Sequence, residues 1–308
     1  MATNYPVTIV IPVYGDWSSL VDCIESLKVN INPELHTVLM VNDCGPDVDN
    51  IERNIKKSIK GFKNFKYYRN DKNLGFVGTC NRVVLDIDKT DNDILLLNSD
   101  TVTTSGFVEE LECVLHESPK NGAVTPRSNN ATIATVPLSA AIKKDTSPEE
   151  SYEIYKKIKP GFSRSTIVPV AHGFCMLIRR ELIKKYGLFD TVFGKGYGEE
   201  VDFCQRIKAK GYRSLLANRA YVFHLEARSF SMEAKKKFIE ANNEIIWKRY
   251  PEYRQSVRDY MESALLKEAA IELSVMNFKK SSFMSNVKKI IKSNKTANKL
   301  IRKYKSNK

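Results

Sequence analysis

Segments typical of buried strands alternate with segments typical of helices through the first third of the chain. The strand-like segments are residues 7–14, 36–43, 64–70 and 92–100, and the helix-like segments are residues 19–27, 75–87 and 105–117. This alternation predicts an α/β fold with a mostly parallel sheet that is covered by helices on both faces. We expect Asp16 or Ser18 to cap the first of these helices and Ser105 to open the third.

The rest of the chain is less regular. Residues 125–150 are rich in Ser, Thr, Asn and Pro, which predicts a loop. The segments that follow predict strand at 166–180, a glycine-rich loop and a helix at 189–212, a strand and an exposed segment at 213–230, and helices beyond about residue 231. We therefore expect one α/β domain over residues 1–230 and a helical extension over residues 231–308.

The composition is typical of a globular protein with a sizeable core. Of the 308 residues, 42% are hydrophobic. No run approaches the roughly 18–20 uncharged apolar residues that span a membrane. The first residues lack the charged and then apolar layout of a signal peptide, so we expect a cytoplasmic protein. The six cysteines are scattered without a C-x-x-C pair, which argues against a zinc site and against a disulfide scaffold.

Positive charge is concentrated near the C-terminus. The net charge is +13, and after Leu273 the chain has eleven Lys and Arg residues and no acidic residue. Such a tail indicates an anionic partner, either phospholipid or nucleic acid. Seven apolar residues lie among these lysines: Phe283, Val287, Ile290, Ile291, Leu300, Ile301 and Tyr304.

We interpret this tail as one or two basic amphipathic helices that lie on an anionic membrane. A solvated helix, a disordered tail and a contact with a partner subunit are the alternatives. Nucleic acid is the weaker hypothesis, because few aromatic residues are interleaved with the basic ones.

Three polar residues lie at the ends of predicted strands: Tyr14, Asp43 and Asp100. In a parallel sheet the carboxyl ends of the strands meet at one edge, where ligands bind, so we expect these residues to converge on one crevice. Each carboxylate also has a local explanation. Asp100 ends Asn-Ser-Asp, which is good turn chemistry, and Asp43 precedes a Pro and Gly turn. A divalent cation for Asp100 and a nucleobase edge or ribose for Asp43 are the functional alternatives.

Gly75 and Gly78 lie at a predicted helix start. Small residues there allow a ligand to approach the backbone closely, and a helix N-terminus favours phosphate. The segment is neither a Walker loop nor a dinucleotide fingerprint. Tight packing of the helix on the sheet is the alternative explanation.

Glu200 lies in the first turn of a predicted helix, after a loop with three glycines. On a helix it shares a face with Phe203, Cys204 and Ile207, whereas Glu199, Asp202 and Arg206 form a more polar stripe in which Asp202 and Arg206 can pair. The helix dipole favours an ionised Glu200, and partial burial opposes it. A general base needs such tuning, although a simple helix cap is the alternative.

His224 ends another predicted strand. Together with Asp100 it would provide a carboxylate and an imidazole for a divalent metal ion. A lone histidine is more often structural, and the same holds for His172, which has only a loop context.

Seven short motifs occur in the order of a known family: IPVYG, VNDCGPD, NLGFVGTCN, LLLNSDTV, HGFCMLIRR, GEEVDFCQR and FHLEARS. Together they resemble family 2 of the inverting nucleotide-sugar glycosyltransferases, over roughly residues 7–230. The resemblance implies the GT-A fold, a Rossmann-like and mostly parallel sheet flanked by helices.

The resemblance also implies roles on the donor side of the site. Pro12 and Tyr14 match the end of the family's first strand, which lines the nucleotide pocket. Asp43 matches the aspartate that recognises the base. Asn73 and Gly75 match the loop beside the nucleoside and the sugar.

A metal site follows from the same resemblance. Asn98 and Asp100 match the first and last positions of the metal-binding DXD motif, so Asp100 is left to carry the metal. His224 matches a further metal ligand near the end of the catalytic domain. The implied cofactor is Mg²⁺ or Mn²⁺.

Glu200 matches the second acid of the family's ED motif, the catalytic base. The family more often has Asp at this position, which leaves Glu199 and Asp202 as alternatives. The implied reaction moves a sugar from a UDP- or dTDP-sugar to a hydroxyl of a cell-surface polysaccharide or lipid-linked glycan. The basic tail would hold such an enzyme on the inner face of the cell membrane.

A nucleotidyltransferase that synthesises sugar nucleotides is the alternative enzyme class. It requires a glycine-rich loop with Arg or Lys directly after the first strand, and PVYGDWSSL has neither. The sequence leaves the oligomeric state open, a homo-oligomer included.

Overall fold

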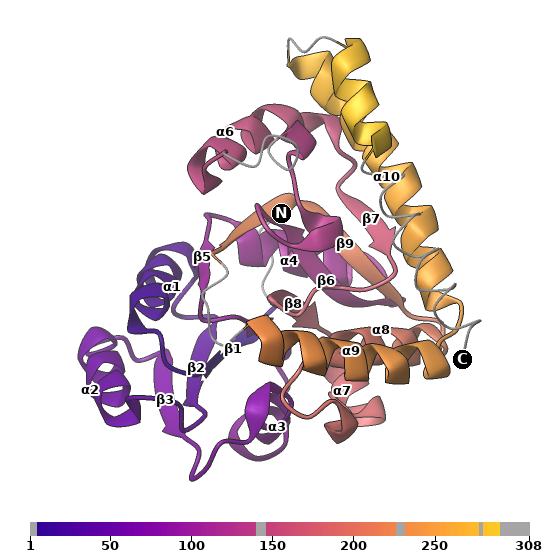
Figure 1. Ribbon diagram of the computed structural model, residues 1–308. Coiled ribbons are helices and arrows are strands. Elements are labelled where there is room, and N and C mark those ends of the chain that lie inside the picture. Colours follow the sequence, from indigo (N-terminus) through magenta and orange to yellow (C-terminus); the bar gives the residue numbers. More distant parts are fainter. Residues whose placement is uncertain (1–4, 140–145, 226–231, 277–279, 290–308) are drawn as a thin grey trace.

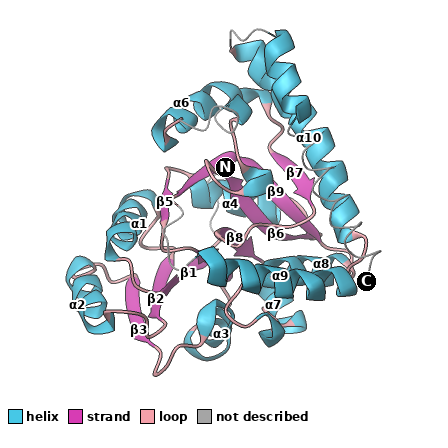
Figure 2. Ribbon diagram, in the orientation of Figure 1, coloured by secondary structure: helices cyan, strands magenta, loops and turns pink. Residues whose placement is uncertain are grey.

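The computed structural model describes residues 5–139, 146–225, 232–276 and 280–289. A nine-stranded sheet runs through the molecule, with helices around it (Figures 1 and 2). The strands are β1 Val7–Val13, β2 Thr37–Asn42, β3 Phe65–Arg69, β4 Asp93–Leu97, β5 Thr101–Thr103, β6 Asn121–Arg127, β7 Ser165–Val168, β8 Cys175–Ile178 and β9 Arg213–His224.

The described helices follow the strands along the chain. The α-helices are α1 Trp17–Asn30, α2 Val48–Ser58, α3 Gly75–Arg82, α4 Phe107–His116, α6 Pro148–Ile158, α7 Arg180–Tyr186, α8 Glu199–Lys208, α9 Met232–Arg249 and α10 Tyr253–Val275. Shorter helical segments are the π-helix η1 Val83–Ile87 and the 3-10 helices η2 Thr132–Ala134, η3 Lys159–Gly161 and η4 Thr191–Phe193. Residues 280–289 are also helical.

The strand order is β3-β2-β1-β4-β8-β6-β9-β5, and β7 pairs with β9. The first four strands in this order are mutually parallel, as the alternation of strands and helices predicts. β8 is antiparallel to both β4 and β6, and β5 and β7 are antiparallel to β9, so the sheet as a whole is mixed. The predicted α/β fold with a helical C-terminal region is confirmed, and its parallel pairs are those of the first hundred residues together with β6 and β9.

The central strands are buried on both faces. Every residue of β4 is buried, as is every residue of β1 except Pro12, because helices cover both sides of a parallel sheet. Asp16 caps α1 with its carboxylate, as predicted, by accepting a hydrogen bond from the backbone N–H of Ser19 at 3.5 Å.

Several local predictions were wrong or incomplete. Gly106, with φ of 76°, is the N-cap of α4 in place of Ser105, because a left-handed backbone there favours glycine. The predicted loop at 125–150 contains the end of β6, η2 and the start of α6. The helix α2 was not predicted, because Ile51 and Ile55 are its only buried residues.

The C-terminal region packs on the sheet domain. α9 crosses in front of the sheet in Figure 1, and its Ile246 belongs to the main hydrophobic core. The predicted boundary at residues 230 and 231 lies outside the described residues. None of the described helices is long and apolar enough to cross a membrane.

The described part of the basic tail folds back on the protein. Phe283 and Val287 are 7% and 1% exposed and pack with Leu138, Leu265 and Ala269. Their apolar surface is therefore not available to a membrane. The remaining apolar positions of the predicted amphipathic tail, from residue 290 to residue 304, lie outside the described residues.

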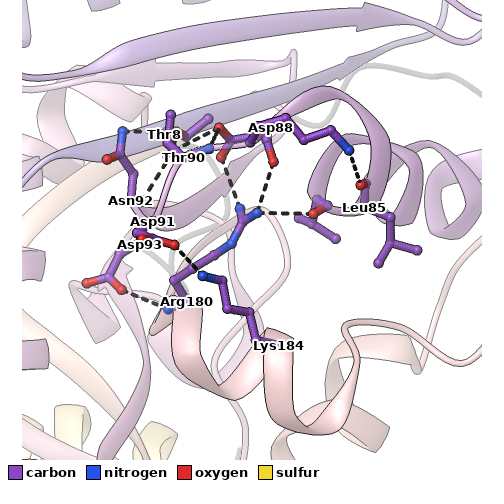
Figure 3. Close-up of polar contacts among 11 residues, drawn as sticks. Thr8, Leu85, Asp88, Thr90, Asp91, Asn92, Asp93, Arg180 and Lys184 are labelled. Atoms are coloured by element: carbon purple, nitrogen blue, oxygen red, sulfur yellow. Dashed lines mark hydrogen bonds and ion pairs between the residues drawn. The ribbon is translucent and has the colours of Figure 1, made fainter.

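A buried ion pair holds α7 against the start of β4. The Arg180 guanidinium donates to the Asp88 carboxylate at 3.0 Å and to the carbonyl oxygens of Val84 and Asp88, and its backbone N–H donates to Asp93 at 2.8 Å (Figure 3). Both side chains of the Arg180–Asp88 pair are less than a tenth exposed. Nearby, the ion pair between Lys184 and Asp91 is exposed to solvent.

These two pairs give a stability prediction. We expect Arg180→Met to lower the free energy of unfolding by about 3–5 kcal/mol, because it leaves the Asp88 carboxylate buried without its cation. Lys184→Met is the matched control and should leave stability nearly unchanged, because its pair is screened by water. Urea unfolding measures both variants, and equal effects would contradict this account.

Candidate active site

The sheet brings the predicted strand ends to one edge. β1 lies between β2 and β4 and is parallel to both. Tyr14 directly follows β1, Asp43 directly follows β2, and Asn98 directly follows β4. Their common edge is the carboxyl edge of the sheet, as the sequence predicts.

Asp43 joins the end of β2 to the start of α3. Its side chain is 4% exposed, and its Oδ1 accepts hydrogen bonds at 2.7 Å from the Asn70 side-chain amide and from the backbone N–H of Leu74. These partners lie 27 and 31 residues away along the chain, so Asp43 is more than a local turn residue. Its carboxylate fixes the loop that carries Asn73.

The start of α3 touches the glycine-rich loop of residues 194–198. Asn73 Oδ1 accepts a hydrogen bond from the Gly75 N–H at 3.0 Å, and Gly75 has φ of +72°. A Cβ atom at Gly75 would lie 3.0 Å from the Cα of Lys195. Glycine is therefore required here for a close approach of two backbones. A Cβ at Gly78 would meet Leu74 of the same helix, which supports tight packing at that position.

Pro12 and Tyr14 lie at the end of β1. Pro12 is opposite Val41 in the parallel ladder and is half-buried. The Tyr14 ring lies against the turn that follows Asp43, since a Cβ at Gly45 would be 2.9 Å from the ring atom Cδ2. The turn after β2 and the end of β1 therefore form one surface.

Asp100 and His224 face one another across β5 and β9. His224 Nε2 lies 3.5 Å from Asp100 Oδ1, and the Leu225 N–H donates to the Asp100 carbonyl at 2.9 Å. His224 Nδ1 lies 2.8 Å from the carbonyl oxygen of Asn130. Because a carbonyl only accepts, Nδ1 carries the proton, and in the neutral ring the lone pair of Nε2 faces the carboxylate.

With the ring protonated this contact is an ion pair, and with the ring neutral the carboxylate and Nε2 can bind a shared cation. The donor set of one carboxylate and one imidazole fits a divalent metal ion. Within the described ranges, no three His, Cys, Asp or Glu side chains are grouped closely enough to hold a metal ion by themselves. A cation here would therefore need ligands beyond Asp100 and His224.

Neighbouring residues hold this pair in place. Asn129 Oδ1 accepts the His224 backbone N–H at 2.8 Å, and the Phe174 and His224 rings stack with their centroids 5.1 Å apart. Asn98 donates its backbone N–H to the carbonyl of Phe174 at 2.8 Å, and its own carbonyl accepts from Thr101. Asn129 and Asn130 were not predicted as site residues, because the composition of their segment indicates only a polar loop.

Glu200 lies at the start of α8 beside the loop of His172. Its Oε2 accepts the Gly198 N–H at 3.1 Å, and a Cβ at Gly173 would contact its side chain at 3.9 Å. Burial raises the pKa of Glu200 above its ordinary value. Burial, aided by the nearby His224, lowers the pKa of His172 to about 4, which keeps that imidazole neutral at pH 7.

The polar stripe predicted on α8 is in fact buried. Glu199 is 5% exposed and Asp202 is fully buried, whereas Glu200 is only half-buried. Phe203, Cys204 and Ile207 are buried, as predicted, and the Asp202 side of the helix is buried as well, because Arg249 and Tyr250 bind Asp202. Burial and the adjacent Glu200 raise the pKa of Glu199 well above its ordinary value.

Asp202 anchors α8 to α9. It pairs with Arg206 at 2.7 Å, as predicted, and its other oxygen accepts at 2.8 Å from both Arg249 and the Tyr250 hydroxyl. Its carboxylate is thus fully engaged with protein donors. Asp202 is a structural residue and not a free acid, which removes it as an alternative to Glu200.

We expect Asp202→Asn to lower the free energy of unfolding by about 3 kcal/mol, because a buried charge partner of two arginines is lost. Asp86→Asn, at an exposed aspartate of η1, is the control and should unfold like the wild type. Urea unfolding at pH 7 compares the two variants. Indistinguishable midpoints would contradict the anchoring role.

Two solved structures are similar to this chain in fold. A crystal structure of GalNAc-T7 with UDP, GalNAc and Mn²⁺ superimposes with a TM-score of 0.55 at 13% identity, over 77% of this chain and 55% of that one. The mannosyltransferase PcManGT from Pyrobaculum calidifontis, in complex with GDP-Man and Mn²⁺, superimposes with a TM-score of 0.57 at 12% identity, over 96% of this chain and 83% of that one. At such identities the likeness shows the fold alone, which is GT-A.

A search of curated protein sequences finds no significant match. Residues 8–187, more than half of the chain, match the sequence profile of glycosyl transferase family 2. This chain therefore belongs to glycosyl transferase family 2.

Proposed function

We propose that this protein transfers a sugar from a nucleotide-sugar donor to an acceptor hydroxyl, with inversion at the anomeric carbon and with the help of Mg²⁺ or Mn²⁺. Family membership supports glycosyl transfer. The observation that carries the proposal is the pair of Asp100 and His224, 3.5 Å apart, beside the carboxyl edge of the sheet. Glu200 borders the same region through the loop of His172 and Gly173.

Asp100 and His224 would hold the cation. The hydrogen bond from His224 Nδ1 to the Asn130 carbonyl orients the ring so that Nε2 faces Asp100, which is the usual support for a metal-bound histidine. When bound, the cation would neutralise the diphosphate that leaves the sugar. The mannosyltransferase and GalNAc-T7 structures both hold Mn²⁺, which supports this assignment.

Glu200 is the proposed general base. An acceptor hydroxyl has a pKa far above 7, so it must lose its proton as it attacks the anomeric carbon. Glu200 would take that proton while the diphosphate leaves from the opposite side of the sugar. One direct displacement of this kind inverts the configuration and requires no nucleophile on the protein.

The donor is proposed to be a UDP- or dTDP-sugar. Asp43 would recognise the base, Pro12 and Tyr14 would line the nucleotide pocket, and Asn73 and Gly75 would border the sugar. The two solved structures hold UDP and GDP-Man, which supports a nucleoside diphosphate carrier. We propose a cell-surface polysaccharide or lipid-linked glycan as the acceptor. The basic tail would bring the protein to the membrane through residues beyond 289.

A thermal-shift screen tests the donor and the cation together. UDP, dTDP, GDP and their sugar conjugates are added with and without MnCl₂, since a ligand that binds only the folded state raises the melting temperature. We expect one nucleotide family to stabilise the protein, and to do so more strongly with Mn²⁺. No stabilisation by any nucleotide, with or without Mn²⁺, would contradict the proposal.

Asp100→Ala should abolish the Mn²⁺-dependent part of this shift, because it removes the carboxylate of the metal site. The nucleotide-only shift should persist, since Asp43 and Tyr14 are intact. Asp86→Ala, at an exposed aspartate, is the control and should behave like the wild type. A full Mn²⁺-dependent shift in Asp100→Ala would exclude Asp100 as a metal ligand.

Glu200→Gln should lower the rate of transfer by about 10²–10⁴-fold with the fold intact, which is the usual contribution of a general base. Glu199→Gln is the discriminating variant and should lose less than about tenfold. Burial raises the pKa of Glu199 well above its ordinary value, which favours the neutral acid, and glutamine resembles that form. Rates on the donor found in the screen measure both, and full activity of Glu200→Gln would rule out the base assignment.

The pH dependence of transfer is a separate test. The base must be ionised, so activity is lost as the pH falls through the pKa of Glu200. Because burial raises this pKa, the acid limb of kcat/KM should lie above the ordinary carboxyl value of 4.5. An acid limb at or below 4.5 would contradict the half-buried Glu200 carboxylate as the base.

A further inference from the structure

We infer that Asn242 of α9 is a positioning residue that holds Glu200 in place through a single peptide group. This inference rests on the proposed function, because it assumes that Glu200 is the base. Asn242 lies outside the residues matched by the family profile, and its side chain is 7% exposed.

Three backbone carbonyls converge on the side-chain amide of Asn242. Its Nδ2 lies 3.1 Å from the carbonyl oxygen of Phe193, 2.8 Å from that of Gly196 and 2.9 Å from that of Tyr197, so its two hydrogens serve three acceptors and one of them is shared. These carbonyls belong to the glycine-rich loop that leads into α8. One side chain of α9 therefore binds both the end of η4 and the loop that follows it.

The loop needs such an external clamp because its backbone is strained. Gly194, Gly196 and Gly198 have positive φ, and so does Tyr197 at 71°, although it has a side chain. A non-glycine residue rarely adopts this conformation unless its surroundings impose it. The hydrogen bond from Asn242 to the Tyr197 carbonyl acts directly at this residue.

The same peptide group reaches Glu200 on its other side. The Tyr197 carbonyl accepts from Asn242, and the Gly198 N–H of that peptide unit donates to Glu200 Oε2 at 3.1 Å. In a trans peptide the C=O and N–H groups point in opposite directions. Asn242 and Glu200 therefore form hydrogen bonds to opposite sides of the same planar peptide group. A hydrogen bond to the carbonyl also strengthens the N–H as a donor.

The rest of α9 fixes the helix that carries Glu200. Arg249, the last residue of α9, and Tyr250, which follows it, bind Asp202 two residues after Glu200. The clamp at Asn242 and the anchor at Asp202 thus hold both the loop before Glu200 and the helix after it. On the opposite side, Lys195 of the loop lies against Gly75.

Asn242→Ala tests the inference, with Asn243→Ala as a matched control at the adjacent, half-buried asparagine. Amide hydrogen exchange, measured well below the melting temperature, should rise by about tenfold in the peptide of residues 193–200, because the three carbonyls lose their hydrogen bonding to the two amide hydrogens of Asn242. Exchange in β1, β2 and β4 should stay as in the wild type. Asn243→Ala should leave all of these segments unchanged.

Kinetics separate positioning from a general loss of structure. In Asn242→Ala the kcat for hydrolysis of the donor found in the screen should fall at least about tenfold, because a displaced base is costly. KM for the donor should change less than about threefold. If Asn242→Ala is too unstable to assay, the same measurements are made on Asn242→Leu, which keeps the volume of the side chain but has no hydrogen-bond donors.

Unchanged exchange at 193–200 in a folded Asn242 variant would overturn the inference. So would a variant in which kcat and KM change as in Asn243→Ala. The exchange measurement reports on the loop alone, so it stands even if Glu200→Gln is fully active. In that case the base assignment fails, and Asn242 has no positioning role in catalysis.

Discussion

Parallel pairing of β1 with both β2 and β4 is the constraint on which the rest of the site depends. It brings the residues after three strands to one edge of the sheet, although they are up to 86 positions apart, from Tyr14 to Asp100. Buried apolar side chains on both faces of these strands fix their register, and the register fixes the positions of the polar residues at the strand ends. Asp43 then extends this fixed edge to the start of α3 through two short hydrogen bonds.

The second half of the site depends on α8 and on α9 of the C-terminal region. α8 would bring Glu200 to this edge only in the orientation that α9 imposes on it. Asp202 is fully buried, and Arg206, Arg249 and Tyr250 donate hydrogen bonds to its carboxylate. These partners offset the free-energy cost of burying the charge, so that Asp202 joins α8 to α9. The proposed metal pair is likewise held from outside, since Asn129 and Asn130 orient His224.

The features that could be predicted from the sequence are those that local patterns of residues determine. Apolar runs that end in polar residues located β1, β2 and β4 and the carboxylates after them, and the i,i+4 spacing predicted the pair of Asp202 and Arg206. Prediction failed where long-range packing decides: α9 buries Asp202 through partners 47 and 48 residues away. Asn242 carried no local signal at all, because its three acceptors are backbone atoms more than forty residues earlier in the chain.

The most direct test of the account is a crystal structure of the protein soaked with MnCl₂ and UDP. We predict an anomalous difference peak for Mn²⁺ within about 2.5 Å of both Asp100 and His224 Nε2, with the diphosphate beside it and the uracil ring next to Asp43. Glu200 should face the open side of the diphosphate with its carboxylate still held by the Gly198 N–H. A metal peak away from Asp100 and His224, or a nucleotide bound elsewhere, would contradict the proposed site.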